Sequence, residues 1–249
     1  MLFNIKSCYN RSEEVRMISA FIMLPILFSF LYQLSTEEQL SFKYLLQRST
    51  CDHCHQPLKF FNLVPILSFC VQRGRTSCCR ERLSVYYLIG ECLALAGAFL
   101  LVRELPISHS LFIALFLLLL TSAISDLVSL TISLNLLFVF LLVCVVLFHC
   151  DWLQFLIVLL ISHILFFIFR FGIGYGDILL INFLALFLPF YLFTYILLFT
   201  FVFAGLFAII VIICGYYRRR LMIPLVPFIF SAFCFVMATY SYLFGGELL

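Results

Sequence analysis

Residues 178–214 form one continuous apolar stretch that contains no charged side chain. A membrane-spanning helix needs about 20 residues to cross a hydrocarbon core of about 30 Å, so this stretch is too long for a single span. Pro189 lies near its middle, and proline breaks the interior of a helix. We therefore expect two helices here, with the turn between them at Pro189.

Further apolar runs occur along the whole chain. Of its 249 residues, 65% are hydrophobic and 11% are charged, and a soluble domain of this size cannot bury so much apolar surface. The runs do not alternate as the strands of a membrane barrel do, which favours helices. The sequence therefore predicts an all-α fold, a polytopic membrane helix bundle of about eight transmembrane helices. The predicted spans are residues 18–34, 84–102, 107–124, 132–149, 152–169, 178–189, 192–214 and 222–244.

Basic residues are distributed unequally between the two sides of this bundle. If the loop 35–83 is cytosolic, its lysines and arginines share one side with Arg170 and with the run Arg218–Arg220. A single helix over residues 178–214 would move Arg218–Arg220 across the membrane and nearly equalise the two sides. The positive-inside rule therefore favours eight spans, with both termini outside the cytosol.

The spans and loops divide the chain into three segments. Residues 1–34 hold a polar N-terminal segment and the first span, residues 35–83 form a cytosolic loop with cysteines, and residues 84–249 form the multi-span domain. Translation from either Met1 or Met17 fits the sequence, because Met17 immediately precedes the first span. The repeated spans argue against a cleaved signal peptide over residues 18–34. The lipid bilayer is the expected partner of the spans, and we expect no nucleic-acid partner.

Two aspartates lie at the cytosolic boundary of this topology. Asp126 ends the third predicted span and Asp177 begins the sixth. Ionisable groups at membrane depth are costly and mark functional sites. Two carboxylates that lie close together share a proton, so one can take a proton from water while the other polarises a peptide carbonyl. The pair therefore indicates peptide hydrolysis.

Glycines precede the second aspartate in the stretch "FGIGYGDILL", residues 171–180. Gly174 and Gly176 permit close backbone approach, as a site that holds an extended peptide requires. The Gly-x-Gly-Asp pattern is short, and other interpretations stay open. Asp177 could simply cap the sixth helix, and Asp126 could end the third in a solvated turn.

Cysteines gather in the polar loop, in "CDHCHQPLKFFNLVPILSFCVQRGRTSCC", residues 51–79. Cys51 and Cys54 form a Cys-x-x-Cys pair, and in a reducing cytosol this pattern predicts zinc rather than a disulfide. A second such pair would place a ligand three residues before Cys79, where the chain has Thr76. The fourth ligand is then Cys78, His53 or His55, and the alternative is a metal-free loop with free thiols.

These features together resemble the type IV prepilin peptidase family, especially the shorter members that serve competence pseudopili in Gram-positive bacteria. The resemblance covers most of the chain from about residue 18. It is carried by "CDHC" and "LVPILSF", by "RGRTSCCRERLSVYYLIGE" (73–91), by "AISDLVSLTIS" (123–133) and by "GYGD" (174–177). The order and spacing of these stretches are more specific than any one motif.

The resemblance implies a membrane-embedded aspartic endopeptidase with Asp126 and Asp177 as its catalytic residues, at the cytosolic face. Its substrate is a prepilin or pseudopilin, cut after a glycine between a basic leader and a hydrophobic helix. Proteolysis in the family needs no cofactor. Many members also methylate the new N-terminus with S-adenosylmethionine, an activity linked to the cysteine loop. Glu91 matches a glutamate frequent in the family, and we expect it to make a hydrogen bond within the packed helices.

This chain departs from the family pattern at several positions. Thr76 replaces a zinc cysteine, Ser133 replaces a proline, and Leu179 replaces a lysine. An asparagine-containing stretch after the first span is absent from "FSFLYQLSTEEQ". These changes bear on zinc binding and methyl transfer, and neither aspartate is among them.

Other classes of protein stay open. Presenilin-like and signal-peptide-peptidase-like proteases share Gly-x-Gly-Asp but lack the cysteine loop. A small ion transporter would need polar residues along several spans, and here Leu, Phe, Ile and Val dominate them. A degenerate membrane zinc protein that binds prepilins without cutting them would have no reason to keep both aspartates.

Overall fold

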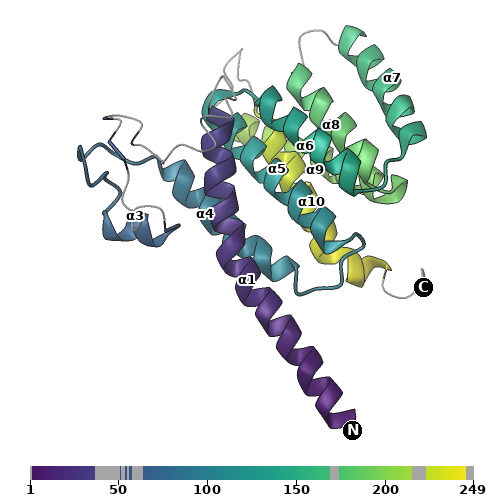
Figure 1. Cartoon of the computed structure of the whole chain (residues 1–249). Coiled ribbons are helices and arrows are strands. Elements are labelled where there is room, and N and C mark those ends of the chain that lie inside the picture. Colours follow the sequence, from purple (N-terminus) through teal and green to yellow (C-terminus); the bar gives the residue numbers. More distant parts are fainter. Residues whose placement is uncertain are drawn as a thin grey trace. The chain divides into compact units, whose positions relative to one another are not determined.

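The computed structural model describes residues 2–36, 51, 54, 56, 57, 64–168, 174–214 and 223–244. Every regular element in these ranges is a helix, which confirms the predicted all-α membrane bundle (Figure 1). The basic residues Arg170 and Arg218–Arg220 of the orientation argument lie outside the described residues. The helices are α1 (Leu2–Thr36), α3 (Leu67–Val71), α4 (Val85–Leu100), α5 (His109–Ser129), α6 (Leu134–Leu147), α7 (Trp152–Ile168), α8 (Tyr175–Phe187), α9 (Phe190–Ile213) and α10 (Val226–Phe244).

Three stretches of the described chain are long and apolar enough to cross a membrane: Ile18–Thr36 of α1, α5 and α9. Shorter apolar helices fill the other predicted positions, namely α4, α6, α7, α8 and residues 226–240 of α10. The helices thus follow the predicted spans one by one. The break between α8 and α9 falls at Pro189, as expected, because Pro189 is the N-cap of α9.

Several boundaries differ from the predicted ones. Helix α1 begins at Leu2, well before the apolar run, and α5 continues to Ser129, so Asp126 lies within its last turn rather than behind it. Helix α8 starts at Tyr175, which places Asp177 in its first turn. Hydrophobicity marks where a chain is apolar, whereas a helix ends where capping groups satisfy its last backbone atoms.

Side-chain caps explain two of these helix starts. Ser133, the residue that replaces a family proline, is the N-cap of α6, and its hydroxyl accepts a hydrogen bond from the Leu136 N–H at 3.4 Å. Asp151 precedes α7, and its Oδ1 accepts from the Gln154 N–H at 3.1 Å. At the C-terminal end of α5, Leu130 adopts a left-handed conformation (φ 54°) that turns the chain toward α6. Serine and aspartate are preferred at such N-caps.

The chain forms two compact units, residues 1–103 and 104–249. In the first unit α1 packs against α4, and Tyr32 meets Tyr87 edge to face with ring centroids 4.7 Å apart. Gly90 lies directly against the ring of Phe28, where any Cβ would overlap ring atoms. Small residues on α4 therefore let the two helices approach closely, as in other membrane helix pairs.

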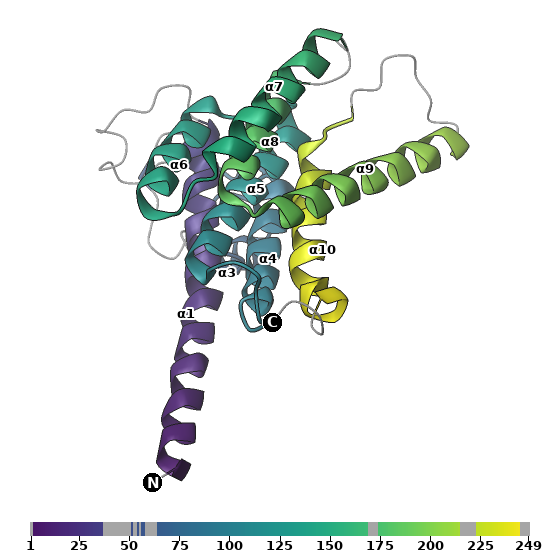
Figure 2. The same ribbon diagram turned by 90° about the vertical axis from the view of Figure 1, so that its right-hand side faces the viewer.

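In the second unit α5 forms the core. It packs against α10 and α6, and stacked rings join it to α10, with the centroids of Phe112 and Phe233 5.6 Å apart. Helix α7 packs mainly against α8, while α9 packs along α10 and extends away from α5 (Figure 2). The outer faces of α7 and α9 expose large apolar side chains, as lipid-facing helices do.

Candidate active site and metal centre

Asp126 lies in the last turn of α5 and is only 6% exposed. Its Oδ2 accepts a hydrogen bond from the backbone N–H of Val226, the first residue of α10, at 3.1 Å. The first N–H groups of a helix have no partner within the helix and carry partial positive charge, so they bind anions. The end of α5 and the start of α10 therefore hold this carboxylate from two sides.

Asp177 is half-buried in the first turn of α8. Its carboxylate hydrogen-bonds to the backbone of Gly174, the N-cap of the same helix. Gly174 is thus the N-cap, and Asp177 is the third residue of the helix rather than its capping residue.

The two glycines are both in tight surroundings. A Cβ on Gly174 would lie 3.1 Å from Asp177 Oδ2. A Cβ on Gly176 would lie 3.0 Å from Cδ1 of Ile132, which belongs to the turn between α5 and α6. Glycine at these positions leaves room for the carboxylate and lets the start of α8 approach the turn that follows Asp126.

The structure brings Asp126 and Asp177 together at one end of the second unit. The two residues lie on α5 and α8, and the turn that follows α5 approaches the start of α8 where Ile132 lies beside Gly176. Asp126 is at the C-terminal end of its helix and Asp177 is at the N-terminal end of its own, as antiparallel spans require. Two acids in such a relation are the arrangement that acid–base hydrolysis uses.

Polar residues next to this pair form a contact that sequence reasoning did not find. His163 of α7 meets the ring of Tyr175, the residue between the two glycines, with centroids 6.0 Å apart. About two turns further along α8, the buried Asn182 donates from Nδ2 to Ser162 Oγ at 3.0 Å. These residues stood out in the sequence only as isolated polar interruptions, and the available signal was their helical spacing along two neighbouring spans.

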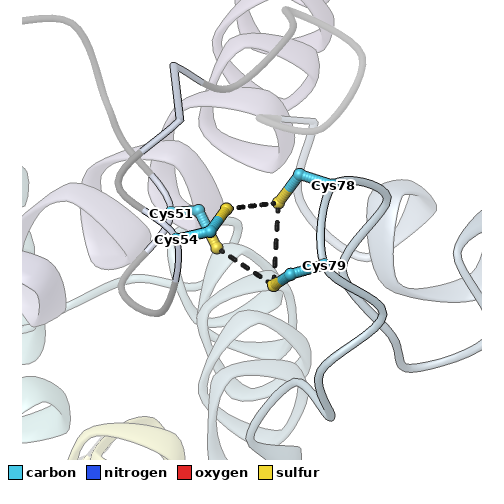
Figure 3. Close-up of side chains that lie close together, drawn as sticks. All are labelled: Cys51, Cys54, Cys78 and Cys79. Carbon is cyan, nitrogen blue, oxygen red and sulfur yellow. Dashed lines mark hydrogen bonds between the residues drawn. The ribbon is translucent and has the colours of Figure 1, made fainter.

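The four predicted cysteine ligands lie together in the first unit (Figure 3). Their Sγ atoms all lie within 4.8 Å of one another. The measured pairs are Cys54–Cys78 at 3.3 Å, Cys51–Cys79 at 3.8 Å and Cys78–Cys79 at 3.9 Å. Zinc–thiolate bonds of about 2.3 Å in a tetrahedron separate the sulfurs by about 3.8 Å, so this donor set fits zinc closely.

Thr76 does not take the position of a fourth ligand. Its Oγ1 lies 3.1 Å from Cys79 Sγ, beside the four sulfurs rather than among them. Cys78 supplies the fourth thiol, and all four cysteines are free of disulfides. The other candidates for the fourth position, His53 and His55, lie outside the described residues.

Hydrogen bonds within the cluster shift the acidity of its thiols. The bond from Thr76 lowers the pKa of Cys79. The bond between Cys78 and Cys54, followed by further contacts with neighbouring thiols, raises the pKa of Cys78 to about 12. Crowded thiols thus resist full ionisation on their own, whereas a bound divalent cation deprotonates coordinating thiols outright. The chemistry of the donor set favours a cation that is bound by four sulfurs.

Glu91 makes the hydrogen bond that the sequence predicted for it within the packed helices. It is 7% exposed, and its Oε1 accepts from Ser29 Oγ of α1 at 2.6 Å. Its Oε2 accepts from the Ile66 N–H, just before α3, at 2.6 Å. Both carboxylate oxygens are therefore bonded inside the first unit.

Two comparisons with known proteins each match about a third of the chain. Residues 22–105 match the family model of the bacterial peptidase A24 N-terminal domain. A curated relative, the prepilin leader peptidase/N-methyltransferase of Bacillus subtilis (strain 168), is 36% identical over 81 residues. That alignment covers 31% of this chain and 33% of the relative, and no solved structure matches. About a third of this chain is thus similar to the bacterial peptidase A24 N-terminal domain, and a part of like size to a prepilin leader peptidase/N-methyltransferase.

Proposed function

We propose that this protein is a membrane-embedded aspartic endopeptidase that removes the basic leader peptide from type IV prepilins or competence pseudopilins, cutting after a glycine. The observation that carries the proposal is the approach of the turn that follows Asp126 to the start of α8, which carries Asp177. The name of the Bacillus relative and the family match agree with leader peptidase activity. The site faces the cytosol of a multi-pass plasma-membrane protein.

The two carboxylates share the work of hydrolysis. The ionised aspartate takes a proton from water as the water oxygen attacks the scissile carbonyl carbon, and the protonated aspartate donates a hydrogen bond to the carbonyl oxygen. The tetrahedral intermediate then collapses, and the aspartate that took the proton from water gives it to the leaving nitrogen as the C–N bond breaks. The products are a leader that ends in a carboxylate and a pilin with a new amino terminus.

Gly174 and Gly176 position the substrate in this proposal. Gly174 is exposed and Gly176 is half-buried, directly beside Asp177. Without side chains, they leave the approach to the carboxylate open for an extended peptide backbone. The hydrophobic helix of the substrate lies in the membrane, and its basic leader stays on the cytosolic side.

Cys51, Cys54, Cys78 and Cys79 would hold a zinc ion. Four thiolates close its coordination sphere, and a zinc of this kind supplies structural cross-linking of a loop rather than an open catalytic position. Proteolysis at the aspartates requires no cofactor. Methylation of the new N-terminus with S-adenosylmethionine is a second candidate activity, which the complete set of four thiols favours in spite of Thr76.

The test is the processing of a co-expressed prepilin, followed by its mobility on a gel, in cells that carry the wild type, Asp126→Asn or Asp177→Asn. Asparagine keeps the shape of the side chain and removes the acid. We expect the wild type to process and both variants to fail at normal membrane levels. If all three process, the protease assignment is wrong; if none does, the protein is a degenerate prepilin-binding relative or, less in keeping with its apolar spans, an ion transporter.

A further inference from the structure

The short helix α3 is tied to the membrane helices through Glu91. Ile66, the residue before α3, has an unusual backbone conformation with a positive φ (φ 61°, ψ −53°), and its N–H donates to Glu91 Oε2 at 2.6 Å. Figure 1 shows α3 beside the pair formed by α1 and α4. A β-branched residue rarely adopts this conformation, so the contact with the carboxylate fixes the start of α3 at one defined position.

The depth of Glu91 sets the depth of α3. Helix α4 has 16 residues and is about 24 Å long at about 1.5 Å per residue, which is shorter than a hydrocarbon core of about 30 Å. The whole length of α4 is therefore needed to span the hydrocarbon core. Glu91 lies about 9 Å along this helix from Val85, so the Ile66 N–H also lies below the headgroups. An unpaired N–H is costly there, and Glu91 satisfies it.

The outward face of α3 is apolar. Leu67 and Val71 are 63% and 81% exposed and lie four residues apart, on one side of the helix, and Val64, three residues before α3, is 41% exposed. In water this surface is unfavourable, whereas acyl chains cover it at no cost. The backbone is also prepared for lipid, because Ser68 N–H bonds to Val64 O at 2.9 Å and Cys70 N–H bonds to Ile66 O at 3.1 Å.

Positive charge follows directly after α3. Arg73, Arg75 and Arg80 are exposed in the hairpin that carries Cys78 and Cys79. Arginines extend their charged heads to the interface while their stems stay on apolar surface, and the cytosolic leaflet is anionic. This order of an apolar helix and then exposed arginines matches the order of acyl chains and headgroups across one leaflet.

We propose that α3 is an interfacial helix inserted in the leaflet on its own side, which is the cytosolic leaflet in the predicted topology. Its apolar face contacts acyl chains, its arginines lie among headgroups, and Glu91 anchors its first residue. The inference goes beyond the proposed protease and does not rest on it. The cysteine cluster, which follows α3 in the chain, is thereby held at the membrane surface.

Tryptophan fluorescence tests this depth, because the chain contains only one tryptophan, Trp152. In a Trp152→Phe background, Leu67→Trp and Val71→Trp each introduce a reporter on the exposed face of α3. Glu81→Trp is the matched control, at an exposed position of the hairpin between Arg80 and Arg82. The variants are reconstituted in phosphatidylcholine vesicles, with or without bromine atoms on the acyl chains, and iodide is the aqueous quencher.

We expect brominated acyl chains to remove most of the emission of the α3 reporters and little of the control emission, with iodide showing the reverse order. A shift of the α3 emission to shorter wavelength accompanies this result. Two positions on α3 keep the test valid if one variant does not insert. The proposal is overturned if iodide quenches the α3 reporters as strongly as the control and brominated lipid leaves them unchanged.

Discussion

Replacing Cys78 tests the assignment of the fourth sulfur ligand. The Cys54–Cys78, Cys51–Cys79 and Cys78–Cys79 sulfur separations, 3.3, 3.8 and 3.9 Å, differ from the tetrahedral spacing of about 3.8 Å by about half an ångström at most, and all four sulfurs lie within 4.8 Å of one another. The four thiols are thus nearly in place before an ion arrives. If the four thiolates contribute equally to the free energy of zinc binding, removing one of them should weaken the zinc affinity roughly a hundredfold. We therefore expect Cys78→Ser to weaken zinc binding by about that factor.

The assay is titration of the purified protein with cobalt, whose thiolate charge-transfer absorption reports sulfur ligands, followed by competition with zinc. Cys70→Ser is the matched control, since Cys70 is an exposed thiol of the same loop outside the cluster. Thr76→Ala removes only the hydrogen bond to Cys79 and should weaken binding roughly tenfold, as outer-sphere changes do. The reasoning is refuted if Cys78→Ser binds like the wild type, or if Cys70→Ser loses as much affinity.

Three further perturbations test other parts of the structure. Gly176→Ala should place a methyl group against Ile132, reduce the stability by about 1–3 kcal/mol and slow leader cleavage. Cleavage kinetics in vesicles measure the loss, and unchanged kinetics would mean that the contact between Gly176 and Ile132 is not tight. Gly90→Ala should lower the thermal stability of the first unit because Phe28 fills the space, and the shorter side chain of Phe28→Leu should restore it. Zinc affinity should rise with pH, because binding must displace protons from thiols such as Cys78, whose pKa is raised to about 12, and a pH-independent affinity would exclude thiolate ligation.

Much of the bundle was predictable because lipid imposes simple rules on sequence. Span length and the absence of charge located the membrane helices, and Pro189 marked the break that the structure has as the N-cap of α9. Helix ends were less accessible. The last turn of α5 contains Ser125, Asp126 and Ser129, so the apolar run stops before the helix does.

The candidate sites were predictable in residue identity and less so in arrangement. Topology predicted only that Asp126 and Asp177 lie at the same end of the bundle, because the third and sixth spans run in opposite directions; it did not predict that the two carboxylates face each other. The sequence left Cys78 as one of three candidates for the fourth zinc ligand, because a regular Cys-x-x-Cys pair would have placed that ligand at position 76. In the structure the turns of the backbone bring Cys78 to the other three cysteines instead. Helix α3 was missed because five residues carry too little periodicity to reveal a helix.

The central claim is that Asp126 and Asp177 act as one catalytic unit, and cleavage rates of the single and double asparagine variants test it most directly. The measurement uses purified protein in vesicles and a synthetic prepilin peptide, with mass spectrometry to define the cut. Residues that act as a unit are strongly non-additive, so each single variant should lose as much activity as Asp126→Asn combined with Asp177→Asn. Cleavage by the wild type after a glycine, with all three variants equally inactive, is the predicted result. A single variant that keeps the wild-type rate would contradict the account.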